Sequence, residues 1–211
     1  MTASNTGKVK LSDGFFRQNA VLMSGLFAGP VIGAATTVEN ALAICMMFTL
    51  VTVISVALCR LLPKKIAFAV RIVLYALISS LVYIPVTLLA GLLFPQSLLQ
   101  SIELYLVIIV INPFILSKTE SRFFLRSVPM MFKDLAGFVL GFDAACILVG
   151  AIRDILTDKI ILNTIVYLPI EIPASGRVFG GFILVGMLAG LIRAIYNRHI
   201  KKKKKGYINQ H

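Results

Sequence analysis

The chain lacks the residues that a soluble enzyme or a disulfide-rich domain needs. It has no tryptophan, two histidines and three cysteines, and charged residues make up only 14% of its 211 residues. Soluble domains carry about 25% charged residues, so the composition excludes a water-soluble globule. His199 and His211 lie in the C-terminal tail, which excludes a Ser-His-Asp arrangement and a histidine metal site. With no glycine-rich phosphate loop either, we expect at most a non-catalytic subunit.

Hydrophobic residues, in contrast, make up 58% of the chain, and the mean hydropathy is +0.92. A helix needs about 20 apolar residues to cross the hydrocarbon core of a bilayer, and six stretches come close to that length. They are residues 18–38, 40–59, 72–94, 98–117, 135–152 and 178–195. The sequence therefore predicts an all-α integral membrane protein with six transmembrane helices.

The membrane domain covers residues 18–195, and the segments on either side of it are short. Residues 1–17 form a polar N-terminal arm and residues 196–211 a basic tail. The lysine run 201–205 fits two readings: an anchor to anionic lipid or a docking site for an acidic partner. The apolar stretch 160–170 is too short to cross a bilayer, so we expect an interfacial or re-entrant segment there.

Positive charge is distributed unevenly between the connections. The formal net charge is +12, and six spans place nearly all Lys and Arg residues on the side that holds both termini. The exceptions are Arg153, Lys159 and Arg177. Because positively charged loops stay in the cytoplasm, we expect a bacterial plasma membrane protein with both termini cytoplasmic. The charge excess then reflects topology and does not indicate a nucleic-acid partner.

Two predicted spans contain helix-breaking residues at corresponding places. Gly29-Pro30 interrupts the first span and Asn112-Pro113 the fourth. Six spans divide into two sets of three. Because each set has an odd number of spans, the second set is inverted relative to the first. Paired interruptions are typical of inverted repeats with a site at the bilayer midplane, whereas simple proline kinks are the alternative. The two repeats would cover about residues 18–94 and 98–195.

Three acidic residues are candidates for ion or proton handling. Asp143 lies in the middle of the fifth span, where a carboxylate is costly unless it is paired, protonated or hydrated. A structural hydrogen bond between helices is the alternative role. Glu39 and Glu120 follow the two interruptions and flank the expected site.

Three motifs resemble those of the paired membrane subunits of the Rnf and Nqr complexes. Gly29-Pro30, followed by Asn40-Ala41-Leu42, resembles their first-span V-L-x-x-L-G-x-C-P signature and N-A-L-G element. Asn112-Pro113, followed by Thr119-Glu120, resembles their fourth-span V-x-N-C element and its acidic residue. The run Gly150-Ala151-Ile152-Arg153-Asp154-Ile155-Leu156 is similar to their G-A-I-R-E-I-L element. The expected orientation resembles that of the Rnf E-type or Nqr D-type member.

The resemblance implies two inverted three-helix repeats whose interrupted spans meet near the midplane, and a pseudo-symmetric paralogue as partner. In that family each member of the pair supplies two cysteines to a [2Fe-2S] cluster. This chain has Gly29 and Pro113 at those positions, and neither offers the thiolate that such a cluster needs. Its own cysteines lie in the second and fifth spans, at Cys45, Cys59 and Cys146. We therefore expect no cluster, no other cofactor and no metal.

The sequence thus predicts a membrane subunit of an Rnf/Nqr-type ion-translocating electron-transport complex, or a divergent paralogue of one. Its expected partners are other membrane subunits and the lipid bilayer. A small-molecule transporter or substrate-binding membrane component is the alternative, because six spans and an inverted repeat suit it too.

Overall fold

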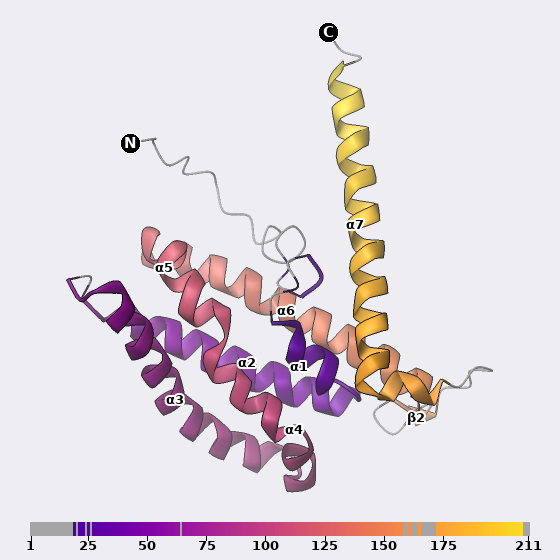
Figure 1. The fold of residues 1–211 in the computed structure, drawn as a ribbon, viewed down its shortest axis with the longest axis horizontal. Coiled ribbons are helices and arrows are strands. Elements are labelled where there is room, and N and C mark those ends of the chain that lie inside the picture. Colours follow the sequence, from indigo (N-terminus) through magenta and orange to yellow (C-terminus); the bar gives the residue numbers. More distant parts are fainter. Residues whose placement is uncertain are drawn as a thin grey trace.

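The computed structural model is almost entirely helical (Figure 1). It describes residues 19, 21–23, 25, 27–63, 65–157, 160–161, 164–165 and 172–208. Within these residues, five helical segments are long and apolar enough to cross a membrane. A two-residue ladder joins β1 (Ile160–Ile161) to the antiparallel β2 (Thr164–Ile165). The prediction of an all-α membrane protein is confirmed, whereas the N-terminal arm and most of the stretch 160–170 lie outside the described residues.

The core is built around α2 (Val38–Cys59) and α6 (Val128–Thr157), which pack side by side. In each, 56% of the most hydrophobic stretch is buried. Small residues allow this close approach: a Cβ added at Gly150 would meet the Cβ of Ala41 at 2.8 Å and the Thr37 carbonyl oxygen at 2.9 Å. The rings of Phe48 and Phe142 meet across the same contact with centroids 3.9 Å apart. Tight packing of this kind replaces the hydrophobic effect as the force that joins helices in lipid.

The third and fourth spans both pack against α2. The third is α3 (Phe68–Leu93), a continuous helix that contains Pro85. The fourth is divided into several pieces, α4 (Gln96–Ile108) and the 3-10 helix η2 (Ile109–Ile111), then the π-helix η3 (Phe114–Lys118), α5 (Thr119–Ser121) and the 3-10 helix η4 (Phe123–Leu125). The helix therefore stops at Asn112-Pro113 and starts again at Phe114.

The first predicted span is not one helix in the part that the structure describes. Only α1 (Ala28–Gly33) forms there, and its six residues are too few to cross a bilayer. The chain before α1 has two residues with positive φ, Gly25 at 65° and Phe27 at 60°. These left-handed conformations end any helix that enters from the N-terminal side.

The last helix, α7 (Val178–Ile208), follows the 3-10 helix η5 (Pro173–Gly176). It touches α1, η5 and the end of α6 near its own start and then leads away from the other helices (Figure 1). Only 11% of its most hydrophobic stretch is buried. Most of α7 is thus free to contact lipid or another protein.

Candidate functional site

The interruption of the fourth span is closed by one side chain. Asn112 is fully buried, and its Oδ1 accepts hydrogen bonds from the backbone N–H groups of Phe114 and Ile115, at 3.0 and 3.1 Å. Its Nδ2 donates to Oγ1 of Thr52 on α2 at 3.0 Å and to the carbonyl of Ile109. Asn112 therefore caps the second half of the broken helix and ties the break to α2.

Asn19, which sequence reasoning missed, makes the same set of hydrogen bonds just before the first interruption. Its Oδ1 accepts from the N–H groups of Val21 and Leu22, both at 3.0 Å, and its Nδ2 donates to the Gly141 carbonyl on α6 at 2.7 Å. The signal in the sequence was an Asn within a span that also contains helix-breaking residues, as at Asn112. Each Asn accepts from the residues two and three positions ahead and then binds a helix of the other half of the chain.

Gly29 and Pro30, predicted as the first interruption, lie inside α1 instead. A proline in the first turn of a helix loses no hydrogen bond, because the first N–H groups have no partner within the helix. The interruption falls on either side of α1, at Gly25 to Phe27 and again at Ala34, where the helix ends. The fourth span, in contrast, breaks at the predicted pair.

The two interruptions meet on one aromatic cluster. Phe27, just before α1, and Phe114, at the start of η3, both contact the ring of Phe48 on α2, with centroids 5.5 and 5.7 Å apart. Phe27 also lies 5.6 Å from the ring of Phe142 on α6. The broken spans therefore converge on the centre of the α2–α6 contact.

Arg153, from the motif 150–154, is the most heavily bonded side chain at the first interruption. It is fully buried, and its five guanidinium N–H donors make five hydrogen bonds to backbone carbonyls. The acceptors are Ile32, Ala35, Ser175, Gly176 and Arg177. The first two lie at the end of α1 and the other three precede α7. Arg153 thus satisfies carbonyls that the ends of short helices leave without partners.

The other members of the motif act on the same junction. The Asp154 carboxylate accepts a hydrogen bond from the Val38 N–H at the start of α2, at 3.1 Å. A carboxylate at this place also interacts favourably with the positive end of the helix. Gly150 allows the contact with Ala41, while Ala151 and Ile152 are half-buried. The motif therefore joins α6 to α1, α2 and α7.

Asp143 faces α2 from the middle of α6. Its Oδ2 accepts a hydrogen bond of 2.8 Å from Oγ1 of Thr49, and its backbone oxygen lies 3.6 Å from Sγ of Cys45. Oδ1 is buried and has no hydrogen-bond partner among the described residues. No described Lys or Arg forms a salt bridge with Asp143.

The two flanking glutamates lie in different environments. Glu120 forms a salt bridge of 2.9 Å with Arg71 on α3 and accepts a short hydrogen bond from the hydroxyl of the buried Tyr75. Glu39 is exposed in the first turn of α2, where a negative charge stabilises the helix start. The structure does not bring Glu39, Glu120 and Asp143 together into one cluster of acidic groups that could hold a metal among the described residues.

A cluster of charged residues that the sequence analysis did not predict lies at the end of the bundle where α2 ends and α6 begins. Asp134 is 2% exposed and takes both a hydrogen bond of 2.7 Å from Arg122 and an ion pair of 3.5 Å with Arg126. Arg60 donates to the Arg126 carbonyl at the same place. We call this part of the molecule, with Arg71 and Glu120, the basic end. An Asp that follows two Arg residues closely in the sequence was the available signal.

The residues present do not fit an iron–sulfur cluster at the two interruptions. A Cβ added at Gly29 would have nothing within 4 Å, so no packing there requires a glycine, but the position supplies no donor. Pro113 supplies none either. The three thiols are buried elsewhere: Cys45 and Cys146 are near one another at the α2–α6 contact, and Cys59 lies about 21 Å further along α2 at 1.5 Å per residue.

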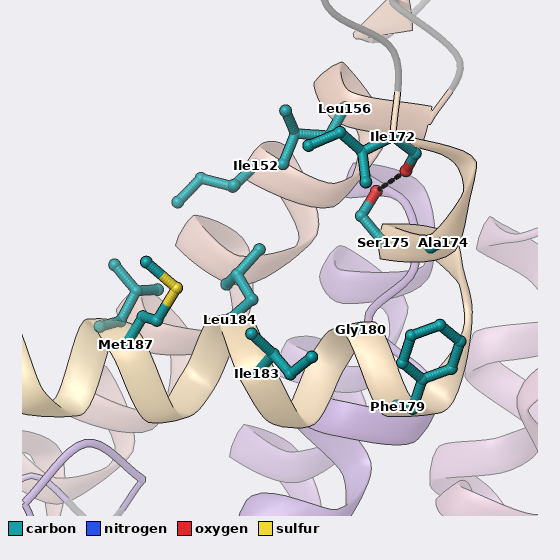
Figure 2. A pocket seen from close by; sticks show the side chains of 11 residues that line it. Ile152, Leu156, Ile172, Ala174, Ser175, Phe179, Gly180, Ile183, Leu184 and Met187 are labelled. Carbon is teal, nitrogen blue, oxygen red and sulfur yellow. Dashed lines mark hydrogen bonds between the residues drawn. The ribbon is translucent and has the colours of Figure 1, made fainter.

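An apolar cavity of about 400 Å³ lies between the end of α6, η5 and the start of α7 (Figure 2). Its walls include Ile152, Leu156, Phe179 and Met187. The hydroxyl of Ser175, the polar side chain among its lining residues, is bonded to the Ile172 carbonyl at 2.7 Å. The cavity therefore offers no free polar group to fix a polar substrate.

Comparison with known proteins places these features in a family. A family model described as Rnf-Nqr subunit, membrane protein, matches residues 8–195. The E subunit of the proton-translocating ferredoxin:NAD(+) oxidoreductase complex of Clostridium ljungdahlii is 27% identical over 198 residues, which cover 90% of each chain. The E subunit of the ion-translocating oxidoreductase complex of Yersinia pseudotuberculosis is 28% identical over 151 residues. That match covers 71% of this chain and 64% of the Yersinia protein, so the chain spans less than two thirds of that relative.

Proposed function

Because the chain belongs to the Rnf-Nqr subunit family of membrane proteins, we propose that it is a membrane subunit, of the E type, of an ion-translocating oxidoreductase complex. The observation that carries this proposal is the family match over residues 8–195. Two relatives from different bacteria, both named as the E subunit of such a complex, add to it. The chain would contribute to ion movement and assembly and would not catalyse a reaction alone.

Within that complex the chain consists of two inverted repeats, residues 18–94 and 98–195, between the N-terminal arm 1–17 and the tail 196–211. Reciprocal hydrogen bonds support this proposal: Asn19 of the first half binds α6, and Asn112 of the second half binds α2. A pseudo-symmetric paralogue would be its partner. The exposed length of α7 leaves surface for such a subunit.

The chain holds no [2Fe-2S] cluster of its own in this proposal. The support is chemical: Gly29 and Pro113 stand where the family pattern has cysteines, and the three thiols lie in α2 and α6. Asp143 and Glu120 are the proposed ion- or proton-handling groups, and Glu39 acts at the start of α2.

The chain would lie in the plasma membrane of a bacterium with both termini in the cytoplasm. The gathering of Arg60, Arg71, Arg122 and Arg126 at the basic end supports this orientation, because positive charge is retained in the cytoplasm. The cavity beside α7 does not support the transporter alternative. It is apolar, and the residues around Asn112 do not line it.

Affinity purification of the tagged full-length chain from its own membranes tests the proposal. We expect flavin- and iron-containing subunits to co-purify, and deletion of the chain to abolish redox-driven ion uptake into vesicles. Purification alone, with substrate transport in liposomes that hold only this chain, would overturn it. Iron and acid-labile sulfide should both be absent from the isolated subunit, and a stoichiometric amount of either would overturn the proposed lack of a cluster.

A further inference from the structure

Two buried side-chain oxygens have no hydrogen-bond partner within the described part of the chain. They are Oγ of Ser55 and Oδ1 of Asp143. A buried polar group without a partner costs about 1–3 kcal/mol, and a native structure rarely keeps one unless water or an ion completes it. Both atoms therefore need an explanation that packing between helices does not provide.

Ser55 belongs to a row of polar side chains on α2 that begins beside Asp143. Thr49, Thr52, Ser55 and Cys59 are three or four residues apart, so they lie on one side of the helix. The last three are fully buried. This row of side chains crosses the core from the middle of the bundle to the basic end.

One end of the row bonds a carboxyl group, and the other end lies near a tyrosine that bonds one. Thr49 donates to Oδ2 of Asp143 at one end. At the other end Cys59 lies near Tyr75, whose hydroxyl donates to Glu120. Between them, Thr52 accepts from Asn112, which is the side chain that closes the fourth span.

We propose that this row is a proton path that connects the basic end, at Glu120 and Tyr75, with Asp143. The inference deepens the proposed function and rests on it, because it names the proton as the ion that this subunit passes. Water beside Ser55 would complete the row. A proton that enters at the basic end converts the Asp143 carboxylate into the neutral acid, and its departure restores the carboxylate, so charge and atoms balance in each cycle.

The chemistry of the row favours a proton over a metal cation. Hydroxyl groups both donate and accept hydrogen bonds, which is what a relay needs, whereas hard cations are held by several oxygens at once. The groups that face Asp143 from α2 are the Thr49 hydroxyl and the Cys45 thiol, and Cys146 lies one turn further on α6. With no basic group paired to it among the described residues, a carboxylate at this depth is favoured only when it is protonated or hydrated.

Inverted membrane vesicles that contain the intact complex test this path. Redox-driven proton uptake, sodium uptake and electron-transfer rate are measured in parallel for Ser55→Ala, Asp143→Asn and the control Ser80→Ala. Ser80 is exposed on α3 and bonds only its own helix at the Ala76 carbonyl. We expect Asp143→Asn and Ser55→Ala to lower proton uptake about tenfold or more, as the loss of a positioned proton carrier does, with Ser80→Ala unchanged.

Ser55→Ala separates the relay from a structural role, because the hydroxyl that it removes has no described partner. The variant should keep its thermal stability while proton uptake falls. Unchanged proton uptake in Ser55→Ala, or sodium uptake that falls with Asp143→Asn while proton uptake stays, would overturn the path.

Infrared spectroscopy of the full-length chain in liposomes tests the path without the complex. A carbonyl band of a protonated carboxylic acid should be present at neutral pH, shift in D₂O and disappear in Asp143→Asn. Absence of this band from the wild-type chain would overturn the proton path. Failure of redox subunits to co-purify would overturn the proposed function while leaving the band in place, so the two failures are distinguishable.

Discussion

The two interrupted spans use the same device and differ in what supports it. At the second, Asn112 is fully buried inside the bundle and binds Thr52 on α2. At the first, Asn19 makes the equivalent bonds to its own backbone and to α6, but the chain then passes through two residues with positive φ before α1 begins. Arg153 must satisfy the carbonyls at the end of α1 from outside.

The difference shows how an interruption within a membrane protein is stabilised. A break of a few residues needs only one side chain with both donors and an acceptor, which Asn provides. A longer break exposes helix ends on both sides, and several unpaired carbonyls are then costly in an apolar environment. The five donors of an arginine meet that need at one place.

Replacement of Arg153 by Met should have the largest effect. The substitution leaves five carbonyls without their donor, and three of them belong to the buried residues Ile32, Ala35 and Ser175, so we expect unfolding or a loss of about 3 kcal/mol or more in stability. Hydrogen exchange should show the loss of protection first in α1 and at the start of α7, with α5 protected as before. Thermal unfolding in detergent measures the total effect.

The matched control is Arg193→Met. Arg193 is exposed and donates to a single carbonyl, that of Met23, at 2.6 Å, so its loss should change little. Equal effects of the two substitutions would mean that the first interruption does not depend on the buried guanidinium.

Replacement of each asparagine by Leu should separate the two interruptions directly. Asn112→Leu removes bonds to Phe114, Ile115, Ile109 and Thr52, and we expect a loss of about 2–3 kcal/mol because the freed groups are buried. Asn19→Leu should cost less, since Arg153 and Asp154 still hold the neighbouring segment. Chemical denaturation of the two variants in the same detergent compares them, and a larger effect at Asn19 would reverse the expected order.

The sequence predicted the helical membrane architecture because long uncharged stretches leave few other structures in lipid. It also predicted an interruption at Asn112-Pro113, because proline breaks a helix when it stands inside one. The sequence analysis placed the first interruption at Gly29-Pro30, because glycine and proline usually break helices. In the structure these residues lie inside α1, since proline is tolerated in the first turn of a helix. Asn19 and Thr52 were missed because their partners lie in other spans, and spacing within one span carries no information on contacts between spans.

A smaller effect is expected at Gly150, where α6 packs closely against α2. A Cβ there would meet Ala41 and the Thr37 carbonyl oxygen below 3.0 Å, so Gly150→Ala should force α2 and α6 apart and cost about 1–3 kcal/mol. Gly91→Ala is the control, because Gly91 is also helical but has nothing within 4 Å of an added Cβ. The control should be neutral or stabilising by up to about 1 kcal/mol, and a loss of stability in both variants by thermal unfolding would contradict this account of the close contact.

Replacement of Gly29 by Cys should have the smallest effect on folding and yet report on the surroundings of the first interruption. The position is exposed, lies in the helix α1 and has open space for a side chain, so stability should change by less than about 0.5 kcal/mol. The three native cysteines are buried and should resist a water-soluble maleimide, whereas the new thiol should react in the detergent-solubilised chain.

Protection of Cys at this position in the assembled complex would show that another subunit covers the first interruption. Labelling at the same rate in both states would mean that the first interruption stays uncovered in the complex. A loss of stability above about 1 kcal/mol would mean that position 29 requires glycine, although the structure leaves open space there.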